Sequence, residues 1–180
     1  YISGNSLTLD GFDNFVGGSG DDTLTFAAFS TARNINLVGL GAVDGFDVDE
    51  ANFIGTFHNI NSVIGSSAIT DTLTGLAALS TWRITGAASG SYTNTNTLLF
   101  SDVETLIGNS PSDTLTFDNF ATERDVTLTD KGADGFNLTV VGFNGAFNNI
   151  NILEGSSAVT DHLTGLNAAG AWTLTGGTNG

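Results

Sequence analysis

The fold is decided by a stretch that occurs twice, Gly65-Ser-Ser-Ala-Ile-Thr-Asp71-Thr-Leu-Thr-Gly-Leu76 and, ninety positions later, Gly155-Ser-Ser-Ala-Val-Thr-Asp161-His-Leu-Thr-Gly-Leu166. Each copy begins with a Gly-Ser-Ser turn, continues through a Thr-Asp pair and ends on Leu-Thr-Gly-Leu. Turn residues followed by alternating apolar and polar residues are typical of a tight turn that enters a β-strand. A turn-and-strand unit that recurs at a fixed distance predicts a stacked architecture.

The same offset relates most of the chain to itself. The matching pairs at offset 90 or 91 include Asp22 with Asp113, Arg33 with Arg124, Phe46 with Phe136, Phe57 with Phe147, Trp82 with Trp172 and Tyr1 with Tyr92. We therefore predict two in-phase solenoid repeats, residues 1–90 and 91–180, that form one continuous solenoid and a window of a longer array. A weaker half-period is visible where an apolar pair precedes Gly17, Gly65 and Gly108.

Composition favours β-structure over helix. The chain has 24 Gly, 13 Phe and one Pro among its 180 residues, and 40% of its residues are hydrophobic. This composition suits short strands, tight turns and a substantial core. With the repeat, it predicts an all-β fold, a parallel β-solenoid (β-helix), with about 20 to 30 residues per coil. The strands that we expect in the first repeat lie near residues 7–9, 24–26, 35–38, 46–48, 60–64, 73–76 and 82–85, with copies about 90 later.

The charge balance limits the partners. Four Lys or Arg stand against 19 Asp or Glu, for a formal net charge of -15. A chain this acidic is expected to be repelled by nucleic acid and by anionic membrane surfaces. It has no apolar span of about 20 residues, so we expect no membrane insertion, and the lack of Cys excludes disulfides and thiolate metal sites. The first residue is not Met, so we expect any targeting segment to lie outside this sequence.

One segment suggests calcium. Gly17-Gly-Ser-Gly-Asp21-Asp22-Thr-Leu-Thr25 fits the nonapeptide GGxGxDxUx and resembles the calcium-binding coils of RTX proteins. The resemblance implies a calcium ion at Asp21 or Asp22, held by oxygens from successive turns. The alternative is a Gly-rich turn, because the second repeat reads Gly108-Asn-Ser-Pro-Ser-Asp113 and has lost most of the glycines. No other cofactor is expected.

The repeated acids and glycines have a structural interpretation. Asp71, Asp113 and Asp161 each precede a Leu-Thr strand, where an aspartate accepts hydrogen bonds from nearby backbone N–H groups. Together with Gly65 and Gly155, these residues are predicted to form a structural turn at a corner of the coil.

Other candidates have mainly structural interpretations. The acidic run from Asp44 to Glu50 is predicted to be an exposed face, with weak cation capture as the alternative. Arg33 is expected to bridge a carboxylate on an adjacent coil, and His58 and His162 to lie on the surface. Trp82 and its copy are predicted to be core residues, with sugar stacking as the alternative.

No catalytic cluster is identifiable, and we predict that the chain is not an enzyme. The Thr-, Asn- and Gly-rich repeats, with phrases such as Phe147-Asn-Asn-Ile-Asn151 and Gly-Ser-Ser-Ala-x-Thr-Asp, resemble repeat regions of bacterial surface adhesins of the filamentous haemagglutinin type. This resemblance implies an extracellular or cell-surface stalk, fibre or sheath component. Its partners would be adjacent repeats or further copies stacked head to tail, with surface glycans as another possibility. A calcium-stabilised adhesin or binding module and a β-helical polysaccharide-active enzyme are the alternatives.

Overall fold

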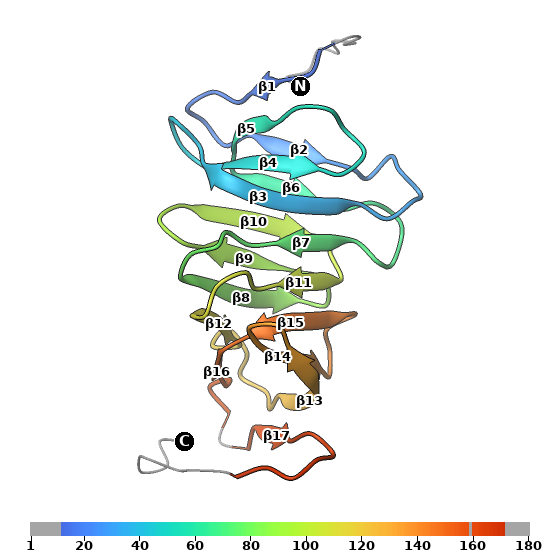
Figure 1. The fold of residues 1–180 in the computed structure, drawn as a ribbon, viewed down its shortest axis with the longest axis vertical. Helices are drawn as coiled ribbons and strands as arrows, with labels where there is room; N and C mark the ends of the chain where they lie inside the picture. The colour runs from blue at the N-terminus through green and yellow to red at the C-terminus, as the bar shows by residue number, and fades with distance from the viewer. Residues whose placement is uncertain (1–11, 159, 172–180) are drawn as a thin grey trace.

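The computed structural model describes residues 12–158 and 160–171, which form seventeen β-strands and no helix (Figure 1). The strands make two sheets that share one apolar core and rise along the long axis of the molecule. The ten-stranded sheet contains, in spatial order, β1 (Phe15–Val16), β5 (Phe57–Ile60), β4 (Phe46–Glu50), β3 (Asn34–Leu40), β7 (Thr72–Thr74), β11 (Thr105–Ile107), β15 (Ala146–Ile150), β14 (Gly135–Val140), β13 (Asp125–Gly132) and β17 (His162–Thr164). The seven-stranded sheet contains β16 (Ile152–Glu154), β12 (Asp113–Thr116), β8 (Ser80–Gly86), β9 (Ser89–Thr93), β10 (Thr97–Ser101), β6 (Ser62–Ile64) and β2 (Thr23–Thr25).

The predicted all-β solenoid is confirmed. The chain passes repeatedly from one sheet to the other, and strands of successive coils pair in parallel. Paired residues lie between 33 positions apart, as for Thr72 and Thr105, and 42 positions apart, as for Phe15 and Phe57. The predicted coil of 20 to 30 residues is therefore too short.

Antiparallel meanders account for the longer coils. In each meander the chain turns back twice within one sheet, so that three strands lie side by side before it crosses over. The three meanders are β3-β4-β5, β8-β9-β10 and β13-β14-β15, and they belong alternately to the ten-stranded and the seven-stranded sheet. This alternation explains why the sequence also shows a weak repeat at half the period.

A full repeat advances the stack by a constant amount. Moving from β5 to β15, from β7 to β17 or from β6 to β16 crosses five strand spacings in each case. At about 4.8 Å per spacing, a repeat of 90 residues adds about 24 Å along the axis.

One expected strand is divided in the structure. The expected strand at 60–64 is two strands in different sheets, because the chain bends at Asn61 after Asn59, whose φ is 56°. Residue 90, the predicted repeat boundary, lies inside β9. The strand expected near 7–9 and the residue Trp172 lie outside the described residues.

The core consists of files of apolar side chains that run along the stack. In the ten-stranded sheet Leu73 pairs with Ile35 on one side and Leu106 on the other, and all three are fully buried. In the seven-stranded sheet Trp82 and Tyr92 are directly paired, with ring centroids 4.6 Å apart. Trp82 is fully buried, so its interpretation as a core residue is confirmed. Burying each such side chain contributes about 1.5–3 kcal/mol.

Candidate functional site: the corner aspartates

Four aspartates occupy equivalent corners of the solenoid. Each stands at the end of a turn and at the start of a short strand: Asp22 before β2, Asp71 before β7, Asp113 at the first position of β12 and Asp161 before β17. We refer to these four residues as the corner aspartates. In each one the carboxylate binds the turn that precedes it, and three of them also bind the neighbouring coil.

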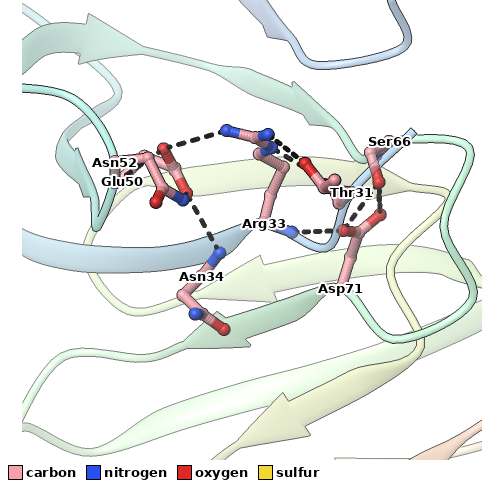
Figure 2. Close-up of polar contacts among 7 residues, drawn as sticks. All are labelled: Thr31, Arg33, Asn34, Glu50, Asn52, Ser66 and Asp71. Atoms are coloured by element: carbon pink, nitrogen blue, oxygen red, sulfur yellow. Dashed lines mark hydrogen bonds and ion pairs between the residues drawn. The ribbon is translucent and has the colours of Figure 1, made fainter. Parts of the chain in front are cut away.

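Asp71 has the most complete set of contacts, and Figure 2 shows them. Its carboxylate accepts the backbone N–H of Arg33 at 2.6 Å and the backbone N–H of Ser66 at 2.6 Å, as well as the Ser66 hydroxyl at 2.9 Å. Asp71 is fully buried. Because Arg33 lies on the neighbouring coil, the carboxylate holds a turn and a coil together.

The other corners use the same pattern. Asp161 accepts the N–H of Arg124 at 2.8 Å, the N–H of Ser156 at 2.7 Å and the Ser156 hydroxyl. Asp113 accepts the N–H of Ser110 at 2.9 Å and the hydroxyl of Ser80 on the neighbouring coil. Asp113 is as buried as Asp71, whereas Asp161 is exposed.

A second set of residues completes the corner from the following coil. The backbone N–H of Asp71 donates to Oε2 of Glu104 at 3.0 Å, and the backbone carbonyl of Asp71 accepts the N–H of Glu104 at 3.2 Å. The equivalent side chains at the corners of Asp22 and Asp113 are Asn61, at 3.0 Å, and Asn151, at 3.1 Å. These three corners therefore connect their own coil to the next.

Sequence reasoning missed this second set. The recurring Asn-Ile-Asn at 59–61 and 149–151 was a usable signal, but its half-period counterpart is Asp102-Val-Glu104 and shares no polar residue with it. The backbone conformation shows that the three triplets are equivalent. The first residue of each has a positive φ, 56° for Asn59, 53° for Asp102 and 59° for Asn149. Asn and Asp tolerate this conformation better than most residues do.

The glycines at the corners are required by close packing. A Cβ on Gly65 would lie 2.8 Å from Oδ2 of Asp71 and would overlap the carbonyl oxygen of Asp102. A Cβ on Gly17 would lie 2.6 Å from Oδ2 of Asp22, and Gly108 and Gly155 are similarly close to their own corner carboxylates. Only glycine lets the turn approach the carboxylate this closely.

Two corner carboxyls have shifted pKa values. Burial raises the pKa of Glu104, and the negative charge of Asp71 adds to this effect, while the hydrogen bond from the Asp71 amide opposes it. For Asp161, burial acts to raise the pKa, but the hydrogen bonds from Ser156 and Arg124 outweigh it, so that the pKa is lowered. Glu104 is thus the corner acceptor whose charge is disfavoured by its surroundings.

The calcium prediction concerns Asp21 and Asp22. Oδ2 of Asp22 accepts the backbone N–H of Gly18 at 2.6 Å, as at the other corners, and Asp21 is exposed. In residues 12–158 and 160–171, no three His, Cys, Asp or Glu side chains are grouped as metal ligands. The hydrogen bond from Gly18 is the contact that the turn interpretation requires, and calcium binding at Asp21 or Asp22 stays a prediction.

The acidic run from Asp44 to Glu50 is not wholly an exposed face. Glu50 is buried, accepts the N–H of Asn52 at 3.1 Å and pairs with Nη1 of Arg33 at 3.7 Å (Figure 2). The prediction of a solvated face is therefore wrong for Glu50, because its carboxylate satisfies donors inside the meander. Arg33 pairs with a carboxylate of its own meander, and its guanidinium lies 4.1 Å from the ring centroid of Phe29.

The two histidines lie beside aspartates. Nδ1 of His58 is 2.9 Å from Oδ1 of Asp47, and Nδ1 of His162 is 3.0 Å from Oδ1 of Asp125. His58 is partly exposed and His162 is exposed, in agreement with the expected surface positions.

Comparison of the chain with protein-family models, with curated proteins and with solved structures finds no match. In the part of the chain that the structure describes, no helix has the length and apolar character needed to cross a membrane. The functional argument therefore depends on the solenoid and its corners.

Proposed function

We propose that this chain is a structural component of a bacterial cell surface, a β-solenoid segment of an extracellular stalk, fibre or sheath. The observation that carries the proposal is the constant advance of five strand spacings per repeat, with hydrogen-bonded corners joining successive coils. A unit that repeats in this way extends along one axis without limit. The resemblance of the sequence to repeat regions of surface adhesins supports the same role.

The corners and the core suit the chain to carry load. Pulling along the axis separates neighbouring coils, and this requires breaking the parallel ladders, the contacts of the apolar files and the corner hydrogen bonds together. A buried carboxylate such as Asp71 adds hydrogen bonds that are stronger than those between neutral groups. The design favours length and durability over the binding of a small molecule.

The proposal assigns no catalysis and no cofactor to the chain. Its partners are adjacent repeats of a longer chain or further copies stacked head to tail, and surface glycans are a second kind of partner. The strongly acidic surface keeps such a rod soluble and away from other anionic polymers.

The test is the length of a tandem fusion. Two copies of the 180-residue chain joined end to end are expected to form a straight rod about 48 Å longer than one copy, as measured by small-angle X-ray scattering. A tandem protein that folds as two globules connected by a flexible joint, with no such increase in a rigid axial dimension, contradicts the proposal.

A further inference from the structure

Equivalent core residues differ in exposure between the middle and the C-terminal end of the stack. Phe46 is 0% exposed, whereas its counterpart Phe136 is 40% exposed. Leu73 is 0% exposed, and its counterpart Leu163 is 45% exposed. The first member of each pair is covered by the next half-repeat, and the second member has no such cover among the described residues.

In the middle of the stack, Phe46 and Leu73 are covered by residues of the next half-repeat. Tyr92 packs against Phe46 with ring centroids 5.5 Å apart, and its hydroxyl accepts the backbone N–H of Leu76 at 2.9 Å. Leu106 of β11 pairs directly with Leu73 of β7. An aromatic residue and a parallel strand therefore complete the core at this level.

At the C-terminal end the same surroundings form a cavity. Its volume is about 600 Å³, and it is lined mainly by apolar side chains that include Phe136, Leu163 and Leu166, the counterparts of Phe46, Leu73 and Leu76. The outermost strand of the described ten-stranded sheet here is β17. The cavity is thus lined by counterparts of residues that are buried at an interface inside the molecule.

The opposite end of the stack carries the matching half. β1 is the outermost described strand of the ten-stranded sheet at that end, and it is the counterpart of β11. The N–H groups of Phe15 and Gly17 bond to β5, at 3.3 Å from the Thr56 carbonyl and 2.9 Å from the His58 carbonyl. Since successive residues of a strand bond to opposite edges, the N–H and carbonyl of Val16 face away from β5.

A loop at this end is also less covered than its counterpart. Phe143 is 8% exposed, and the next residue, Asn144, donates its N–H to the carbonyl of Ala87 in the β8–β9 turn at 2.6 Å. Phe53, the counterpart of Phe143, is 40% exposed. Both ends of the stack therefore expose surfaces that are buried where one repeat meets the next.

We infer that these two ends bind each other, so that a second copy of this chain docks head to tail with its β1 parallel to β17. The register is that of β11 on β7, which places Phe15 of the incoming copy opposite Leu163. This inference rests on the proposed structural function and specifies the contact surface and its register. A head-to-tail contact that does not close produces a filament.

The experiment measures association of the full chain over a concentration series by sedimentation velocity. We expect the wild-type chain to form linear oligomers, and Leu163→Asp to weaken association about tenfold or more, because it buries a charge in the junction. Ile69→Asp is the matched control, since Ile69 is 82% exposed on the side of the stack, and its association should equal that of the wild type.

A second variant tests the direction of assembly. Val16→Pro removes the N–H on the edge of β1 that faces away from β5 and leaves the hydrogen bonds to β5 in place, so each variant has one damaged end. Mixed together, Val16→Pro and Leu163→Asp should form heterodimers and nothing longer. Circular dichroism melts of each variant show whether it is folded.

Three results would overturn the inference: a wild-type chain that stays monomeric, a Leu163→Asp variant that associates as the wild type does, or a mixture that forms no heterodimer. The tandem fusion separates this outcome from failure of the proposed function. A rigid tandem rod together with monomeric single chains rejects the junction alone, whereas a flexible tandem rejects the structural role.

Discussion

Replacing Asp71 with alanine leaves three donors without an acceptor inside the stack, the N–H groups of Arg33 and Ser66 and the Ser66 hydroxyl. A buried donor that loses its partner costs about 1–3 kcal/mol. The two backbone amides cannot turn away, whereas the hydroxyl can rotate, so we expect a loss of about 3–5 kcal/mol in the free energy of unfolding. This is a large part of the roughly 5–15 kcal/mol that stabilises an ordinary domain.

The assay is urea unfolding followed by circular dichroism. With a slope of about 2 kcal/mol per molar urea, the expected loss lowers the midpoint by about 1.5–2.5 M. The chain supplies a matched control in Asp161→Ala, because Asp161 has the same three kinds of donor but is exposed. Water can replace that carboxylate, so the loss should be no more than about 1 kcal/mol.

Comparison of the two variants tests the reasoning directly. If both lose the same free energy, burial does not determine the strength of a corner and the account given for Asp71 is wrong. The same conclusion follows if Asp71→Ala is no less stable than the wild type.

The remaining predictions concern pH, steric fit and metal. Glu104→Gln keeps a side-chain oxygen as acceptor and removes a carboxyl group whose pKa in the folded state is raised, mainly by burial. A group with a raised folded-state pKa stabilises the fold when protonated and loses that contribution as pH rises through this pKa. Thermal melts should therefore favour the variant at neutral pH, and this advantage should disappear below about pH 4. Gly65→Ala should lower stability in urea by about 1–3 kcal/mol, whereas Gly20→Ala, with no atom near the added Cβ, should be neutral. Adding a chelator should leave the melting temperature unchanged, and a decrease that Asp21→Asn or Asp22→Asn abolishes would instead establish the calcium site.

The solenoid could be predicted because its signal is carried by repetition. Matching residues at a fixed offset, such as Phe46 with Phe136, identify equivalent positions without any knowledge of how the strands pair. The meanders could not be predicted in this way. For example, β4 and β9 are the central strands of two meanders in different sheets. Their sequences share no residue at equivalent positions: β4 reads Phe46-Asp-Val-Asp-Glu50 and β9 reads Ser89-Gly-Ser-Tyr-Thr93.

The corner residues likewise fall into those that the repeat identifies and those that it does not. Gly65 and Asp71 attract notice because they recur, and the structure places the carboxylate against the turn that begins at this glycine. Glu104 does not attract notice, because its counterparts at the other corners, Asn61 and Asn151, are a different residue type that supplies the same side-chain oxygen. The apolar residues of segment 60–64 likewise give no sign of the change of sheet within it, since that change depends on the backbone angle at Asn59.

The meanders also determine how the chain can begin to fold. Pairing one coil with the next closes a segment of 33 to 42 residues, whereas β8 and β9 are joined by only Ala87 and Ala88. Short hairpins form in microseconds and lose little chain entropy, while distant pairings are slower. Each meander can therefore assemble from local contacts and offer a ready three-stranded edge. A long chain of such units would start folding at many places at once, and its growth would not depend on the first coil being correct.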